Sequence, residues 1–183
     1  MKSEDQTDRF RDVILPHMDA AYNFARFLVR DAVAAEDIAQ DAFLRAFRSL
    51  ETWRGEFAKA WLLAIVRNCF LDWTKTHRGE RWMAEAAEED ADEAVRSDRA
   101  DDSDPETLLL RQRDMELIRN TLERLPEPFR EVLILRELEE LSYKEISSLI
   151  GAPIGTVMSR LARARRMFGA LLSAHEPQGA NRS

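Results

Sequence analysis

The sequence predicts an all-α fold, with two small helical domains joined by an acidic flexible linker. Ala, Leu, Glu and Arg are abundant and the 183 residues include only six Gly, a composition that favours helices over strands. Large apolar residues recur three or four positions apart, which is the period of a helix with one buried face. One acidic stretch that is poor in large apolar residues interrupts this pattern and divides the chain into two parts.

The net charge of −7 is distributed unevenly along the chain. Residues 1–79 carry no net charge, residues 80–107 carry −9, and residues 108–183 carry +2. We therefore predict a helical domain over 1–79, a linker over 80–107, a second domain over 108–174 and a tail over 175–183. The alternative for 80–107 is a solvated acidic helix within one domain. Because the acidity belongs to this stretch, the total charge does not exclude nucleic-acid binding by the flanking parts.

Composition and spacing exclude several functional classes. Cys69 is the only cysteine, so neither an internal disulfide nor a Cys-rich zinc module can form. The three histidines lie far apart without metal-ligand spacing, and we expect no metal and no cofactor. No paired nucleophile and base and no phosphate-binding loop are present, so we expect no enzyme. Apolar runs are too short for a membrane span and the N-terminus lacks a signal peptide's apolar core, so we expect a cytoplasmic protein without membrane insertion.

Two helical segments are expected before residue 51. The apolar pattern predicts a helix over about 9–30 that kinks or restarts at Pro16. Asp31 is a suitable N-cap for a second helix over about 32–50. The polar face of this second helix is acidic, and it is either a solvated surface or a docking surface for a basic partner. The residues of this face that we single out are Asp37, Gln40 and Asp41.

A basic helix rich in aromatic residues is expected over about 57–77, after a short polar break at 51–56. Residues 57–78 carry a net charge of +3. Basic side chains can hold a phosphate backbone and aromatic faces can stack exposed bases, so this segment fits nucleic acid. The alternative is that most of its aromatic residues belong to the core. The aromatic residues in and just before this segment are Trp53, Phe57, Trp61, Phe70 and Trp73.

The C-terminal part has the layout of a helix-turn-helix. Ser142 and Glu145 form a capping box at the start of a helix over 143–150. Gly151 suits a left-handed C-terminal position, and Pro153 then begins a further helix. Two helices joined by a turn of about three residues match the DNA-binding motif. Upstream of this motif, helices are expected over 108–122 and 129–138.

The second helix of this motif has two different faces. One is apolar and should be buried, and the other carries hydroxyl groups and arginines. Residues 151–172 contain four Arg and no acidic residue. Such a helix can enter the DNA major groove, where Arg reaches guanine or phosphate, and the alternative is a basic helix that balances the acidic linker. The expected buried positions are Ile154, Val157, Leu161, Ala164, Phe168 and Leu171, and the expected exposed positions are Thr156, Ser159, Arg160, Arg163 and Arg166.

Several blocks of the sequence resemble one family, the sigma-70-type transcription initiation factors. Residues 37–47 are similar to the family's second region, and residues 61–72 to the adjoining promoter-melting region. Residues 125–133, 141–146 and 153–165 resemble its fourth region. The chain is most similar to the extracytoplasmic-function group, because its length leaves no room for the first and third sigma domains.

The resemblance implies a role for each matching position. The acidic face would dock on the β′ clamp helices of core RNA polymerase, with the β flap as a second contact. The loop at about 52–59 would capture a flipped base of the minus-ten element, and the linker would thread through the polymerase. The implied residues are Asp37, Gln40 and Asp41 for polymerase; Trp53, Arg54, Phe57, Lys59, Arg67, Asn68 and Lys75 for minus-ten DNA; and Thr156, Met158, Ser159, Arg160, Ala162, Arg163 and Arg166 for minus-thirty-five DNA.

The resemblance also implies partners beyond the polymerase and promoter DNA, namely an anti-sigma factor that acts in a stress or environmental response. Met158 stands where many family members carry Lys or Arg and cannot donate a hydrogen bond to a base. We therefore expect Ser159, Arg160 and Arg163 to carry the recognition. The competing hypotheses are a stand-alone helix-turn-helix regulator with an N-terminal sensing or dimer domain, and a helical adaptor without a DNA role.

Overall fold

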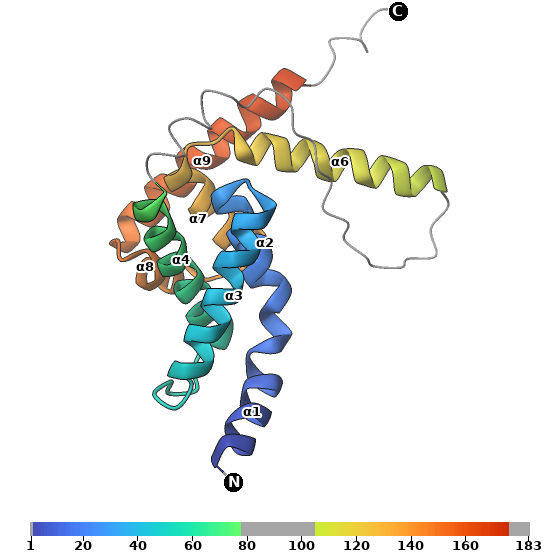
Figure 1. Cartoon of the computed structure of the whole chain (residues 1–183). Coiled ribbons are helices and arrows are strands. Elements are labelled where there is room, and N and C mark those ends of the chain that lie inside the picture. Colours follow the sequence, from blue (N-terminus) through green and yellow to red (C-terminus); the bar gives the residue numbers. More distant parts are fainter. Residues whose placement is uncertain (1, 78–104, 176–183) are drawn as a thin grey trace, which may run out of the picture.

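The computed structural model describes residues 2–77 and 105–175, which are built from helices joined by short loops (Figure 1). Neither range contains a strand, and the all-α prediction is confirmed. The predicted linker and tail lie almost entirely outside these ranges. The elements in order are α1 (Lys2–Val13), η1 (Leu15–His17), α2 (Met18–Val29), α3 (Ala32–Ser49), α4 (Ala58–Thr76), α6 (Pro105–Glu123), α7 (Glu127–Glu137), α8 (Tyr143–Ile150) and α9 (Ile154–His175).

The N-terminal helical segment is longer than predicted and is broken at Pro16. The 3-10 turn η1 separates α1 from α2 and confirms the expected break. However, α1 begins at Lys2, well before the predicted start. Its first turns are polar and show no apolar period, so the pattern could not reveal them. Tertiary contacts hold this helix: Gln6 Nε2 donates to the O of Phe47 at 2.8 Å, and the ring of Phe10 lies edge-on to that of Phe47 at 5.3 Å.

Helices α2, α3 and α4 pack against one another and bury the core of the N-terminal half. Asp31 caps α3 as predicted, because its Oδ1 accepts from the N–H of Ala34 at 2.7 Å. The loop after α3 ends at Phe57, which has a left-handed φ of 51°, and α4 begins at the next residue. This conformation is costly for a residue with a Cβ. Hydrogen bonds lie on both sides of it: Trp53 Nε1 donates to the O of Glu56 at 3.1 Å, and the N–H of Trp61 donates to the O of Phe57 at 2.9 Å.

The predicted helix-turn-helix is present as α8 and α9. Both hydrogen bonds of the capping box form: the N–H of Ser142 donates to Oε2 of Glu145 at 2.8 Å, and the N–H of Glu145 donates to Oγ of Ser142 at 3.2 Å. Gly151 ends α8 with a left-handed φ of 66°. Ser147 Oγ donates to the O of Ala152 at 2.6 Å and closes the turn.

Helices α6 and α7 both begin slightly before the predicted positions. Pro105 is the first residue of α6, and Pro128 lies in the first turn of α7, where proline is tolerated because no intrahelical N–H is needed. In Figure 1, α6 extends away from the other helices and meets α9 near its own C-terminal end.

The apolar face of α9 is buried with one exception. Val157, Leu161 and Ala164 are at most 1% exposed, and the residues predicted to follow them on this face are partly buried. The prediction for Ile154 is wrong, since its side chain is 45% exposed. Ile154 is the first residue of α9, where the turn from α8 leaves the side chain at the end of the helix.

The two halves of the described chain pack against each other. Helix α2 lies against α7 and α4 lies against α8, so each half contributes two helices to the contact (Figure 1). Buried residues of both halves form one continuous apolar cluster. The residues predicted to contact nucleic acid on α4 therefore lie near the C-terminal half.

Candidate nucleic-acid interface

The polar face of α9 forms one side of an open hollow. Residues of α9 line it together with Pro128 and Phe129 at the start of α7. The guanidinium of Arg163 lies 5.3 Å from the centroid of the Phe129 ring, which is a cation–π distance. The hollow therefore presents cations and hydroxyl groups on a rigid helix, as phosphate and base recognition requires. The residues of α9 that line it are Thr156, Ser159, Arg160, Arg163 and Arg166.

Two further predicted contacts of α9 are exposed but do not line this hollow. Met158 is 53% exposed and Ala162 is exposed. The remaining arginine of the helix, Arg165, is bound elsewhere: its guanidinium donates to Oε1 of Glu137 at 2.6 and 3.0 Å. Ser159, Arg163 and Arg166 are exposed as predicted, whereas Thr156 and Arg160 are half-buried.

The loop before α4 offers one open aromatic side chain. Phe57 is 67% exposed, and Arg54 next to the loop's glycine is exposed as well. Trp53 is half-buried, and its Nε1 donates to the O of Glu56 at 3.1 Å. Its ring lies 5.6 Å from that of Trp61 and 5.5 Å from the guanidinium carbon of Arg9. Of the two aromatic residues predicted here for base capture, Phe57 is therefore the more accessible.

The first cation of α4 is bound by the C-terminal half. Lys59 Nζ lies 2.8 Å from Oε2 of Glu139 and donates to the backbone O of the same residue at 2.9 Å. The side chain of Glu139 is only 8% exposed. Lys59 thus binds a nearly buried carboxylate that comes from the turn after α7.

The second cation of α4 is bound in the same way. Arg67 Nε donates to Oε1 of Glu131, a residue of α7, at 2.6 Å. The Glu131 side chain is 7% exposed, and burial raises the pKa of its carboxyl above the usual value, against the opposing effect of Arg67. The positive charge of Arg160 on α9 acts on the same carboxyl. Glu131 therefore lies within electrostatic reach of predicted DNA contacts on both α4 and α9.

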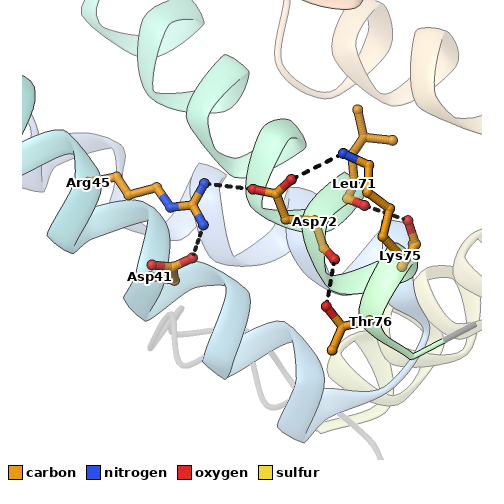
Figure 2. Close-up of polar contacts among 7 residues, drawn as sticks. Asp41, Arg45, Leu71, Asp72, Lys75 and Thr76 are labelled. Atoms are coloured by element: carbon orange, nitrogen blue, oxygen red, sulfur yellow. Dashed lines mark hydrogen bonds and ion pairs between the residues drawn. The ribbon is translucent and has the colours of Figure 1, made fainter.

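A second polar network joins α3 to α4 on the outside of the N-terminal half (Figure 2). Arg45 donates to Asp72 at 2.9 Å and lies 2.8 Å from Oδ2 of Asp41. Lys75 lies 3.3 Å from the other oxygen of Asp72. The hydrogen bond from Arg45 lowers the pKa of Asp72 and raises that of Arg45 itself. Asp41 and Lys75, which were predicted for different partners, therefore belong to one network.

The remaining predicted residues are open to solvent. Asp37 and Gln40 are exposed on α3, and Asn68 is exposed on α4. The thiol of Cys69, by contrast, is 3% exposed, and burial raises its pKa to about 12. Along the chain, Asn68 thus lies between Arg67, which binds Glu131, and the buried Cys69.

Sequence reasoning missed the three carboxylates that bind the predicted cations Lys59, Arg67 and Lys75, and it missed Arg45, which binds the predicted Asp41. Arg45 stands four residues after Asp41, a spacing that signals an ion pair on one helix face. Asp72 stands three residues before Lys75 on the same helix and had the same kind of local signal. No local signal exists for Glu131 and Glu139, because each meets its partner from the other half of the chain.

Residues 2–77 and 105–175 bear on the metal and membrane predictions. Within them, no three His, Cys, Asp or Glu side chains are grouped as metal ligands would be. None of the helices there combines the length and apolar character needed to cross a bilayer.

The chain matches known protein families and has similar relatives. Residues 13–80 match the family described as sigma-70 region 2, and residues 115–168 match sigma-70 region 4. An ECF RNA polymerase sigma factor SigE from Mycolicibacterium smegmatis is 33% identical over 92% of this chain, which spans 63% of that relative's length. The RNA polymerase sigma-H factor of Pseudomonas aeruginosa is 40% identical over 75% of this chain and 72% of its own. The ECF RNA polymerase sigma-E factor of Escherichia coli is 37% identical over 70% and 69%.

Solved structures agree with the sequence matches. The sigma factor RpoE from Bartonella quintana, solved with the anti-sigma factor NepR, superposes with a TM-score of 0.71 at 27% identity, over 91% of this chain and 98% of that one. CnrH, solved with the cytosolic domain of CnrY, has the same fold with a TM-score of 0.62. The relatives are transcription initiation factors rather than enzymes, which confirms the prediction that the chain is not an enzyme. The chain belongs to the sigma-70 family, among its ECF sigma factors.

Proposed function

We propose that this chain is an initiation subunit that binds core RNA polymerase, recognises minus-ten and minus-thirty-five promoter elements, and promotes melting of the DNA between them and the start site. The observation that carries the proposal is the polar face of α9. Five polar side chains of one helix line an open hollow there, within a helix-turn-helix. Arg side chains on such a helix can reach guanine or phosphate in the major groove.

The N-terminal half supplies the other two contacts of this proposal. The exposed Asp37 and Gln40, with Asp41 held by Arg45, present an acidic surface that suits the β′ clamp helices of the polymerase. The exposed Phe57 suits a base taken out of the stack, since an aromatic face can replace stacking with its neighbours. Lys59, Arg67 and the exposed Lys75 of α4 suit the phosphates of that strand.

These contacts give each segment of the chain a different role. Residues 1–79 would dock on polymerase and read the minus-ten element, residues 108–174 would read the minus-thirty-five element, and residues 80–107 would cross the polymerase between them. The place of action would be the cytoplasm. An anti-sigma factor would control the chain in a stress or environmental response. The sigma–anti-sigma complex among its structural relatives supports this last point.

In vitro transcription tests the proposal. Purified core polymerase, the full chain and a pool of genomic promoter fragments should give transcripts from a small set of start sites, and none without the chain. The variant Asp37→Ala/Gln40→Ala should lose polymerase binding, whereas Asp19→Ala, which removes an exposed acid from α2, should not. Absence of chain-dependent, sequence-selective transcripts would exclude initiation. Selective binding to duplex DNA without polymerase would favour the stand-alone regulator.

A further inference from the structure

We infer that the guanidinium of Arg9, on α1, is a further phosphate contact for the single strand of minus-ten DNA. The inference rests on the proposed function, because it extends the minus-ten face beyond α4 and the loop that precedes it. It gives the first helix a part in promoter binding, which neither the sequence analysis nor the proposed function assigns to it.

Helix α1 is held against the end of α3, next to the loop between α3 and α4. In Figure 1, α1 and this loop lie at the same end of the molecule. Gln6 Nε2 donates to the O of Phe47 at 2.8 Å. The ring of Phe10 lies edge-on to those of Phe43 and Phe47, with centroids 6.4 and 5.3 Å apart. These contacts fix the place of Arg9, which directly precedes Phe10 in the same helix.

The side chain of Arg9 reaches the loop itself. Its guanidinium carbon lies over the ring of Trp53, 5.5 Å from the ring centroid. Trp53 Nε1 donates to the O of Glu56, the residue directly before Phe57. One indole therefore separates the cation of Arg9 from the backbone that holds Phe57, the exposed side chain proposed to take the flipped base.

The same indole links α1 to α4. The ring centroid of Trp53 lies 5.6 Å from that of Trp61, and the two ring planes are tilted by 30°. Trp61 belongs to the first turns of α4, and its N–H donates to the O of Phe57 at 2.9 Å. Contacts on both sides of the loop therefore hold the cation of Arg9 at a fixed place beside the site of base capture.

The contact with Trp53 leaves hydrogen-bond donors of Arg9 available. A guanidinium carries five N–H donors, and an aromatic face attracts the charge but accepts only a donor that points at it. Arg9 is exposed, and among the side chains that the structure describes no carboxylate forms an ion pair with it. By contrast, Arg11 lies 2.9 Å from Oδ1 of Asp8 and 3.2 Å from Oδ1 of Asp12. Arg9 is therefore the cation of this helix that is open to a phosphate.

The loop itself offers a phosphate little net positive charge. Arg54 is its one exposed cation, and the exposed Glu51 and Glu56 lie on either side of it. A base that stacks on Phe57 brings the phosphates of its own nucleotide and its neighbour to this loop, where those carboxylates repel them. The cation of Arg9, supplied from α1, offsets this repulsion and adds a charge-assisted hydrogen bond.

The salt dependence of single-strand binding tests the inference on the full chain. The test variant, Arg9→Met, keeps a long side chain over the indole and removes the charge. The matched control, Arg11→Met, removes an exposed cation from the same helix and changes the net charge equally. A third variant, Arg9→Lys, keeps the charge. The probe is a fluorescent single-stranded oligonucleotide of mixed sequence, because phosphate contacts carry no sequence information.

The expected result is a change of slope that is specific to one position. Each phosphate contact contributes about 0.7 to the slope of log affinity against log salt for a single strand. Arg9→Met should therefore flatten the slope by about 0.7 and weaken binding about fivefold at about 0.1 M salt, with the difference closing toward about 1 M. Arg11→Met and Arg9→Lys should keep the slope of the unaltered chain. Circular dichroism checks that all variants remain helical.

Three results would overturn the inference. These are equal slopes for Arg9→Met and Arg11→Met, weaker binding by Arg9→Met with an unaltered slope, or no binding of the oligonucleotide by the unaltered chain. The second result would mean that Arg9 only holds the indole of Trp53 in place.

The binding measurement contains no polymerase, so it separates this inference from the proposed function. A chain that fails to initiate transcription but loses slope only in Arg9→Met would contradict the proposed function alone. A chain that initiates transcription but gives equal slopes for Arg9→Met and Arg11→Met would contradict this inference alone.

Discussion

The two candidate DNA-binding faces of this chain differ in how open they are. On α9, Arg163 and Arg166 are exposed and line an open hollow with hydroxyl groups. On α4, Lys59 and Arg67 each bind a nearly buried glutamate of the other half. The difference lies in what packs beside each helix, since both carry cations at helical spacing. A basic helix in a sequence therefore indicates a capacity to bind DNA, and the tertiary structure decides when that capacity is available.

The segment from α7 to the following turn contacts both α4 and α9, but through different glutamates. Glu131 and Glu139 face α4, whereas Glu137 faces α9 and engages only Arg165, which the sequence did not assign to DNA. One acidic segment thus binds Lys59 and Arg67 of α4 through its nearly buried glutamates and Arg165 of α9 through an exposed one.

The largest expected effect concerns the open face. Arg160→Ala/Arg163→Ala should reduce transcription from a selected promoter by about a hundredfold, because a good contact between Arg and a base contributes about 1–3 kcal/mol. Arg113→Ala, which removes an exposed cation from α6, should change it little. Transcript yields at several concentrations of the chain measure the effect. Equal loss in all variants would point to stability rather than recognition.

The next effect concerns the closed face. Arg67→Met should lower the free energy of unfolding by about 3 kcal/mol, because it leaves the carboxylate of Glu131 buried without its cation. Arg45→Met, which breaks the network of Figure 2, should cost clearly less, because those side chains are 41–50% exposed and water screens them. Urea denaturation of both variants makes the comparison. A larger loss for Arg45→Met would show that burial does not distinguish the two networks.

A smaller effect should follow from the raised pKa of Glu131. The folded chain holds the carboxyl proton of Glu131 more tightly than the unfolded chain does. The stability that this proton contributes to the folded chain is therefore present at low pH and is lost as the pH rises from 4.5 through the raised pKa. Glu131→Gln removes the titration. The stability of the unaltered chain should therefore fall relative to that of the variant between pH 4.5 and pH 7. A relative gain over this interval would mean that Arg67 outweighs burial.

The smallest effect concerns Cys69, which distinguishes loss of the two ion pairs from unfolding. Its thiol is buried in the N-terminal half with a pKa raised to about 12, so alkylation at pH 8 should be slow in the unaltered chain. Glu131→Ala/Glu139→Ala should react equally slowly, because the substitutions remove two ion pairs and leave the apolar residues around Cys69 unchanged. Rapid labelling of that variant would show unfolding of the N-terminal half instead.

Local signals in the sequence located most of the helices, and distant contacts account for what they missed. Asp31, the capping box at Ser142 and Gly151 act within one turn of the backbone, so each could be identified from its neighbours. The faces of α9 followed from a period of three to four, apart from Ile154 at the helix end. These signals depend only on residues that lie close together in the chain.

The two ion pairs between α4 and the C-terminal half could not be foreseen in this way. Arg67 meets Glu131 and Lys59 meets Glu139 across the whole linker, and no spacing rule connects residues so far apart. The composition of α4 still predicted a cationic face correctly. Its partner in the free chain is set by the packing of α4 on α8 and of α2 on α7, which arises only when both halves fold.

Photo-crosslinking from one probe on each face tests the difference between the two readers most directly. The probe amino acid replaces Asn68 on α4 or Ala162 on α9, which are both exposed. In the free chain, the probe at 162 should crosslink to promoter DNA more strongly than the probe at 68, because Lys59 and Arg67 on α4 are bound by Glu139 and Glu131. In the complex with core polymerase, both should crosslink, the probe at 68 to the minus-ten region. Equal crosslinking by the probe at 68 with and without polymerase would contradict the account.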